Sequence, residues 1–266
     1  GAVIVKKLLD IKIRPICGRL TLAFANVEAY LQFDPDNPDA SRYVDQDLNR
    51  VWSPITLDNQ KENSSELSRA RAMRPVIDTV DLLLDLHSMH EKSAPLIVSG
   101  PLEKSIALAR NLGTPTTIIS DEGHSDGCRL RDYADFGDAV SQKNALLIEC
   151  GQHWESNSIH VAQDSTARFL IQAGMQNSDG LLSSWLSRQS TPSRLIRVTH
   201  AVIATSMDFR FAGPYTGLEM FHEAGSVIGW NNGQEIVTPY PDCVLVMPSI
   251  RQLRPGVTVV RLGQIV

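Results

Sequence analysis

No stretch of this sequence is both apolar and long enough to cross a lipid bilayer. A transmembrane helix needs about 20 consecutive, mostly apolar residues, and every apolar run here is much shorter. The first residues, GAVIVKKLLDIKIRP, also lack the order of regions that a secretory signal peptide has. We therefore expect a cytoplasmic protein with no membrane partner.

Cysteine is sparse, and positive charge is not in excess. The cysteines Cys17, Cys128, Cys150 and Cys243 form no C-x-x-C pair, so neither a thiolate zinc knuckle nor a disulfide framework is indicated. Cys150 lies inside an apolar run and is interpreted as a small core residue. The 25 basic and 30 acidic side chains give a formal net charge of -5. Because this charge attracts no phosphate backbone, we expect no nucleic-acid partner.

The sequence does contain short apolar runs that alternate with helical segments. Hydrophobic residues make up 42% and charged residues 21%, as in ordinary globular proteins. The runs at 19–25, 80–87, 94–100, 114–120 and 144–150 are typical of buried strands. Candidate helices lie at 61–80, 102–112 and 160–187. This alternation predicts an α/β fold, in which a mainly parallel, mixed sheet is flanked by helices.

The last part of the chain has a different pattern. Around residues 188–196 the sequence is polar, contains Pro192 and shows no periodicity, which indicates a linker. The runs beyond it are β-rich, with Gly, Pro and Asn turns between them. We therefore expect a catalytic domain over residues 1–190 and a smaller, all-β C-terminal domain over residues 191–266, whose exposed sheet edges would support a homodimer.

The segment DLHSMH at 85–90 is the first that carries residues suited to chemistry. His87 follows an apolar strand directly, and ligand sites of open α/β sheets lie at such carboxyl ends. An imidazole there can bind zinc, and Asp85, two residues earlier, can orient it from the same side. A strand-end histidine that only hydrogen-bonds its neighbours is an equally good interpretation of this segment alone. His90 is interpreted as a surface or loop residue.

The segment LLIECGQH at 146–153 is the second. Glu149 interrupts an apolar strand near its end, and burying a carboxylate without a purpose is costly. Beside a metal-bound water, such a carboxylate would have a shifted pKa and act first as general base and then as general acid. The alternative is a structural glutamate in a salt bridge. His153 is a weaker candidate, for a contact with the substrate or the transition state.

The segment SRYVDQDLNRVW at 41–52 is the third, because it concentrates Arg42, Asp47, Asn49 and Arg50 after a Pro- and Asp-rich loop. Guanidinium groups bind a planar carboxylate in a bidentate geometry. We interpret the cluster as a clamp for an amino-acid carboxylate or a dicarboxylic acyl group. For any one of these residues alone, a solvated position at a helix start is the better interpretation.

Taken in the order DLNR, DLHS, ECGQH, the three segments resemble the succinylglutamate desuccinylase and aspartoacylase family, a branch of the zinc carboxypeptidase-like fold. The resemblance covers nearly the whole chain. It implies a hydrolase with one Zn²⁺ per chain that cleaves the amide bond of an N-acyl amino acid. It assigns a zinc ligand to His87 and the general base to Glu149. The residues that it assigns to the substrate are Arg42, Asn49, Arg50 and, in the C-terminal domain, Tyr215, with Asp47 and Asp85 in supporting positions.

One part of the family's pattern is missing from the sequence. Members carry a His-x-x-Glu pair that supplies two zinc ligands before the position of Arg42, whereas the first histidine here is His87. The opening GAVIVKKLLD resembles the helix that follows this pair, so we expect the sequence to begin downstream of the pair and of an N-terminal strand. If residue 1 is the true start, His87 alone cannot hold zinc, and the chain would be a metal-free pseudoenzyme that binds a carboxylate-bearing acyl amino acid. Cleavage of a peptide, as by a zinc carboxypeptidase, is a further alternative.

Overall fold

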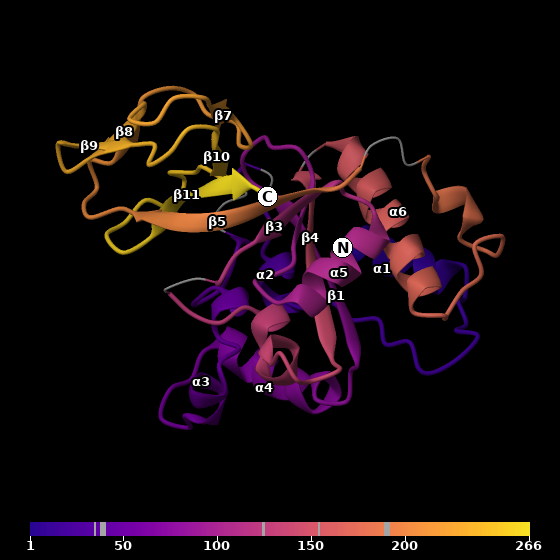
Figure 1. The fold of residues 1–266 in the computed structure, drawn as a ribbon. Coiled ribbons are helices and arrows are strands. Elements are labelled where there is room, and N and C mark those ends of the chain that lie inside the picture. Colours follow the sequence, from indigo (N-terminus) through magenta and orange to yellow (C-terminus); the bar gives the residue numbers. More distant parts are fainter. Residues whose placement is uncertain (35, 38–40, 124–125, 154, 189–191) are drawn as a thin grey trace.

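The centre of the structure, a computed structural model, is an eight-stranded sheet with the order β1-β4-β2-β3-β5-β11-β10-β7 (Figure 1). The residues described are 1–34, 36–37, 41–123, 126–153, 155–188 and 192–266. The strands of this sheet are β1 (Leu82–Met89), β2 (Leu96–Val98), β3 (Thr117–Ser120), β4 (Asn144–Gln152), β5 (Arg194–Ile203), β7 (Met220–Phe221), β10 (Cys243–Val246) and β11 (Thr258–Ile265).

Parallel pairing prevails in the first half of the sheet. Strand β1 pairs with β4, β2 with β3, and β3 with β5 in parallel, while β2 and β4 are antiparallel. From β5 onward every pair is antiparallel. A second, three-stranded antiparallel sheet contains β6 (Arg210–Phe211), β8 (Val227–Asn231) and β9 (Gln234–Val237). The predicted α/β class is therefore confirmed, including the smaller β-rich region at the C-terminal end.

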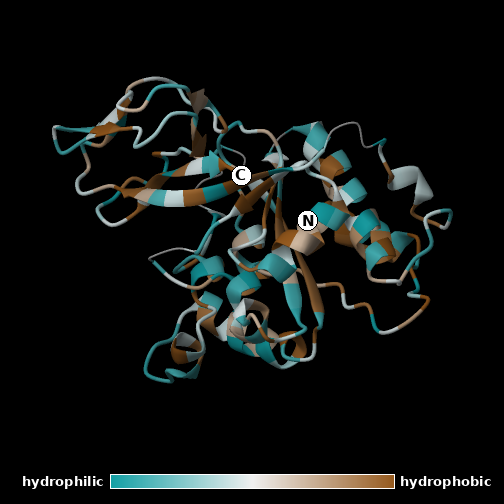
Figure 2. Ribbon diagram, in the orientation of Figure 1, coloured by the Kyte–Doolittle hydropathy of each residue, from teal (hydrophilic) through white to brown (hydrophobic). Residues whose placement is uncertain are grey.

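Helices cover both faces of the parallel half, because side chains alternate along the strands. On β4, Leu146, Ile148 and Cys150 join one core cluster with α1 (Ala2–Asp10), α5 (Glu103–Leu112) and α6 (Ser156–Gln172). Ala145 points the other way and packs with α3 (Pro54–Asp58) and α4 (Ser65–Ile77). Figure 2 shows the result as apolar strands at the centre, with polar residues on the outer sides of the helices. Cys150 is buried, as the sequence predicts.

The short elements complete this architecture. They are the helix α2 (Val27–Leu31) and the 3-10 helices η2 (Leu48–Arg50), η3 (Leu130–Asp132), η4 (Ala134–Gly137) and η5 (Ser183–Trp185). Helix α4 lies within the predicted range 61–80 and begins at Ser65, because the Ser64 hydroxyl accepts a hydrogen bond from the backbone N–H of Leu67. Among the described helices, none combines the length and the apolarity of a membrane span.

Two predictions about elements are wrong. Residues 19–25 form no strand: only Leu20 and Leu22 pack on the core, and the carbonyls of Phe24 and Ala25 accept hydrogen bonds from Arg69 instead of from a neighbouring strand. The helix predicted over 160–187 starts earlier and ends at Gln172, because Gly174 takes a left-handed conformation, with φ 69°, that stops it.

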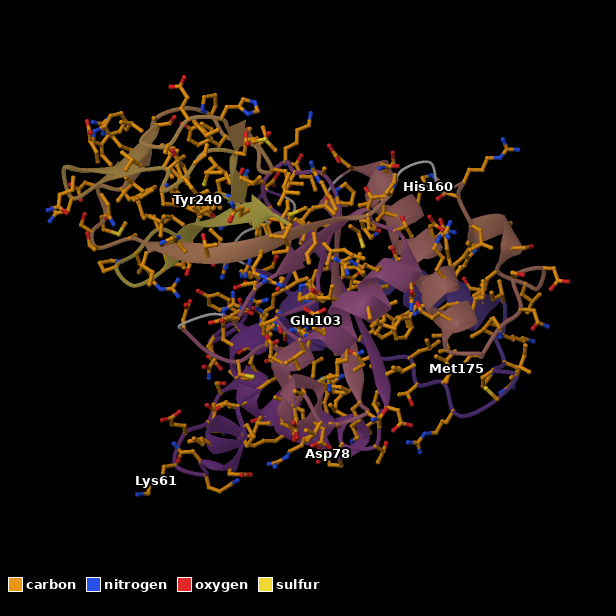
Figure 3. All side chains as sticks on the ribbon, in the orientation of Figure 1. Lys61, Asp78, Glu103, His160, Met175 and Tyr240 are labelled. Carbon is orange, nitrogen blue, oxygen red and sulfur yellow. The ribbon has the colours of Figure 1, made fainter. Side chains whose placement is uncertain are left out.

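Strand β5 connects the two halves of the sheet. Its first residues, 194–197, pair with β3, and residues 196–203 pair with β11. The C-terminal strands also have a core of their own, which includes Val202, Phe209 and Leu245. In Figure 3 this part, with Tyr240, lies opposite the end of the molecule that carries Lys61. The predicted linker over 188–196 is wrong at its end, because β5 already begins at Arg194. The domain boundary at residue 190 stays a prediction, since residues 189–191 lie outside the described part of the chain.

Candidate active site

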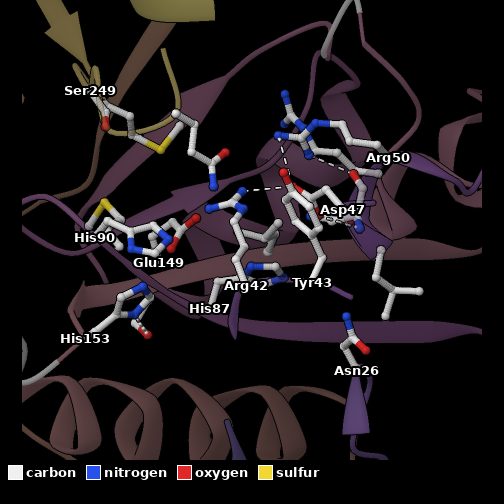
Figure 4. A pocket seen from close by; sticks show the side chains of 18 of the residues that line it. Asn26, Arg42, Tyr43, Asp47, Arg50, His87, His90, Glu149, His153 and Ser249 are labelled. Atoms are coloured by element: carbon white, nitrogen blue, oxygen red, sulfur yellow. Dashed lines mark hydrogen bonds and ion pairs between the residues drawn. The ribbon is translucent and has the colours of Figure 1, made fainter. Parts of the chain in front are cut away.

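A cavity of about 990 Å³ lies at the carboxyl ends of β1 and β4. Its walls come mainly from the segments 25–33, 41–52, 85–93, 126–130 and, in the C-terminal part, 247–261. Figure 4 shows that side chains from the first two segments and from β4 point into this space. The three segments that the sequence singled out therefore meet at one place.

His87 and Glu149 lie opposite each other on neighbouring strands, because β1 and β4 pair with these two residues in register. The Nε2 atom of His87 lies 2.9 Å from Oδ2 of Asp85, the neighbour that the spacing predicted. Burial alone would lower the pKa of His87. The charge of Asp85 and its hydrogen bond outweigh burial, and with the more distant Glu149 they raise this pKa to about 9.

The Glu149 carboxylate is not the salt-bridged structural group that the sequence left open. Its Oε2 atom is buried and has no hydrogen-bond partner among the described residues, which also give it no ion pair. Burial raises the pKa of Glu149, although the positive charges of His87 and Arg42 act in the opposite direction. A carboxylate with a raised pKa and a free oxygen in a cavity is suited to transferring protons.

Asp47 orients the two arginines of the predicted clamp. Its Oδ2 accepts a hydrogen bond of 2.8 Å from Nη2 of Arg42 and lies 3.8 Å from Nη2 of Arg50. Its Oδ1 accepts from the backbone N–H of Asn49 and so caps η2. In Figure 4, Arg42 lies between Asp47 and Glu149. The Nε atom of Arg42 is buried and has no hydrogen-bond partner in the described part of the chain.

Asn49 links the clamp to the opposite wall of the cavity. Its Oδ1 accepts a hydrogen bond of 2.9 Å from the backbone N–H of Leu130, and the backbone of Arg50 pairs with Cys128. The chain comes so close here that a Cβ at Gly127 would lie 2.2 Å from the carbonyl oxygen of Arg50. Only glycine fits at this position, whose φ is 143°.

The charge of Asp47 predicts how stability depends on pH. Burial alone would raise the pKa of Asp47, but Arg42, Arg50 and the hydrogen bonds lower it below its usual value. A depressed pKa contributes stability above the unfolded pKa, and this contribution is lost as the pH falls through the folded pKa. We expect Asp47→Asn to lower the melting temperature near neutral pH and to approach the wild type in acid. A difference in melting temperature that stays constant from neutral pH to acid would contradict this.

Two arginines that the sequence reasoning missed also line the cavity. Arg129 and Arg261 are 3% and 4% exposed, and both contact the buried carboxylate of Asp121. The distances from Oδ2 of Asp121 are 2.5 Å to Nη2 of Arg129 and 3.0 Å to Nε of Arg261. The sequence did contain a signal for Arg261, because this charged residue interrupts the apolar run VTVVRLG as Glu149 interrupts its own strand. Arg129 lies in a loop segment and had none.

Of the remaining candidates, two histidines line the cavity and one tyrosine does not. Tyr215 is not among the lining residues: its ring packs edge-on against Phe211 and Phe221, at 5.7 Å and 5.6 Å between centroids, against the C-terminal core. His153 does line the cavity and contacts the Ser88 hydroxyl at 2.6 Å. His90, predicted as a surface or loop residue, follows the end of β1 and also lines the cavity, where its ring packs against that of His153 at 4.4 Å between centroids.

The described residues do not make up a complete metal site. No three His, Cys, Asp or Glu side chains among them are grouped so that they could hold an ion. A catalytic zinc takes three protein ligands and keeps a position for water. The described part of the chain provides His87, which Asp85 orients, as one possible ligand, but it does not provide the other two protein ligands.

The chain is similar to one protein family and to several solved structures. A family model of the succinylglutamate desuccinylase/aspartoacylase catalytic domain matches residues 4–173. The structure is similar to a succinylglutamate desuccinylase from Vibrio cholerae, with 17% identity and a TM-score of 0.70 over 99% of this chain and 76% of that one. It is also similar to the ectoine utilization protein EutE (DoeB) from Ruegeria pomeroyi, with 15% identity and a TM-score of 0.65 over 99% and 80%. At these identities the structures show a shared fold. No curated protein matches the sequence.

Proposed function

The chain belongs to the succinylglutamate desuccinylase/aspartoacylase family, and on that premise we propose that it hydrolyses the amide bond of an N-acyl amino acid. One observation supports this most. Two buried polar atoms on the same cavity, Oε2 of Glu149 and Nε of Arg42, have no hydrogen-bond partner among the described residues. Because a buried polar group without a partner is costly, their arrangement suits a polar ligand that carries both an anionic group and a hydrolysable bond.

The two groups take different parts in the proposed reaction. The raised pKa of Glu149 matches a base that accepts the proton of the attacking water and then donates it to the leaving amine. Arg42 and Arg50, which Asp47 orients, bind a carboxylate of the substrate and so place its amide bond beside Glu149. The products are a carboxylate and a free amine.

We propose one Zn²⁺ per chain as the cofactor, with His87 as a ligand, because the family resemblance implies it. The described residues supply only this ligand of the set, so the metal requirement has to be tested separately from the acid–base role of Glu149. The same observation favours a second candidate, a metal-free protein that binds an acylated amino acid without cleaving it. Both candidates use the same carboxylate clamp.

The experiment measures zinc content and amine release on protein produced from the complete reading frame. We expect about one zinc per chain, and release of amine from N-succinylglutamate or N-acetylaspartate but not from analogues whose carboxylates are amidated. His87→Ala should lose the zinc, whereas His160→Ala, on the exposed side of α6, should keep it. Saturable binding without zinc and without cleavage would favour the second candidate. Cleavage of peptides alone, or neither binding nor cleavage, would overturn both.

A further inference from the structure

Glu66 is a fully buried carboxylate that lies outside the cavity wall, in the first turn of α4. Its Oε1 accepts hydrogen bonds of 2.7 Å from the backbone N–H of Val44 and 3.0 Å from Nδ2 of Asn26. Its Oε2 accepts bonds of 3.1 Å and 3.2 Å from the backbone N–H groups of Asp45 and Gln46. One carboxylate thus holds three consecutive peptide groups, the segment 44–46.

The start of α4 holds the same segment through further bonds. The Ser64 hydroxyl accepts a hydrogen bond of 2.7 Å from Nε2 of Gln46, and Oδ2 of Asp45 accepts one of 2.7 Å from the backbone N–H of Ser65. The positive end of the helix dipole also favours a carboxylate in the first turn. The bonds to its own partners lower the pKa of Glu66 despite its burial. The carboxylate therefore stays charged and keeps its four acceptor positions in use.

The segment 44–46 separates the two residues that form the central contact of the clamp. Arg42 precedes it and Asp47 follows it, and the segment belongs to no helix or strand. The hydrogen bonds of a helix or a sheet therefore do not fix the distance between Arg42 and Asp47. We propose that Glu66 is a positioning residue, which fixes the segment 44–46 and thereby sets the place at which Arg42 presents its guanidinium to a substrate carboxylate. This role rests on the proposed carboxylate binding by Arg42.

A purely structural role is the alternative, and Asp164 provides a matched comparison. This carboxylate on α6 is 3% exposed, and it accepts hydrogen bonds from the backbone N–H of Ser187 and from Nε of Arg168. It also contacts the Ser187 hydroxyl. Asp164 thus fixes a loop as Glu66 does, but neither it nor its partners line the cavity. Loss of either carboxylate should destabilise the fold, whereas only loss of Glu66 should affect the binding of an anion.

The test compares Glu66→Gln with Asp164→Asn. In Glu66→Gln the side-chain NH₂ group faces backbone N–H donors that need an acceptor, so the segment 44–46 has to move. A displaced guanidinium loses a charge-assisted hydrogen bond to the carboxylate, which is worth about 10- to 100-fold in affinity. We expect about a 10- to 100-fold weaker affinity for succinate, measured by titration calorimetry, and a similar rise in KM with a smaller change in kcat. Asp164→Asn should lower the melting temperature by a similar amount and leave both constants unchanged.

Each other outcome also decides the question. If Glu66→Gln does not fold, Ser64→Ala is the second variant, because it removes only the hydrogen bond from Gln46 and the helix cap. It should weaken succinate binding by a smaller factor than the one expected for Glu66→Gln. Unchanged affinity and KM in a folded but less stable Glu66→Gln protein would overturn the positioning role. Succinate binding needs no catalysis, so a wild-type protein that binds succinate without hydrolysing any amide would refute the hydrolase alone. Binding that Arg42→Ala leaves unchanged would refute the clamp, and this role with it.

Discussion

Replacement of Glu149 by Gln is expected to lower kcat by about 100- to 10,000-fold, the usual contribution of a positioned acid–base group. The amide has the same size but cannot accept the proton of the attacking water. Because Oε2 of Glu149 is buried and makes no hydrogen bond among the described residues, no structural contact is lost with it. KM should therefore change little. The measurement is steady-state amine release, with circular dichroism to confirm the fold.

A measurement of stability distinguishes the loss of the catalytic base in Glu149→Gln from a general disturbance of the fold. Burial disfavours the charged form of Glu149, so the neutral amide should leave the melting temperature unchanged or raise it. Glu155→Gln, at the exposed start of α6, serves as the control and should keep full activity. A Glu149→Gln protein that hydrolyses its substrate at the wild-type rate would exclude Glu149 as the base.

The second large effect is expected from Asp121→Asn. The Asp121 carboxylate lies between the buried guanidinium groups of Arg129 and Arg261. Its removal leaves both charges buried without their shared counter-ion. Breaking a buried pair in this way costs about 3–5 kcal/mol. We expect urea unfolding to show a loss of this size in the free energy of unfolding.

An exposed ion pair provides the comparison for this loss. Lys6 and Asp10 lie 2.7 Å apart on α1, with side chains 73% and 59% exposed. Such surface pairs contribute about 0–1 kcal/mol, so Asp10→Asn should change the free energy of unfolding by no more than that. Equal losses for Asp10→Asn and Asp121→Asn would show that Asp121 does not have the structural importance that its burial indicates.

The apolar runs predicted most of the fold, because burial in a sheet covered on both faces requires nearly continuous apolar strands. The run 144–150 became β4 for that reason. The same signal failed at 19–25, where two leucines pack on the core from an irregular segment. A short apolar run indicates that a segment is buried, but it does not show that the backbone of the segment pairs with a strand. The strand with which it would pair lies elsewhere in the chain.

The site was predictable where its residues share a strand end or a short segment. Asp85 and His87 lie two positions apart on β1, and Arg42 and Asp47 belong to one segment. Contacts between distant segments gave no such signal. Asn49 contacts Leu130 across 81 positions, and Glu66 holds residues 20 to 22 positions before it. Tyr215 lies outside the cavity wall, packed against the C-terminal core by aromatic neighbours that the sequence did not reveal.

The pairing of β5 with both β3 and β11 links the C-terminal strands of this chain directly to the parallel half of the sheet. Arg261 stands on β11 at the cavity, while its counter-ion Asp121 follows β3. A C-terminal region taken from a relative would have to match the edge of β5 and the charge of Asp121 at once. Substitutions in the loop 248–254, which lines the cavity outside β5 and β11, would avoid both requirements.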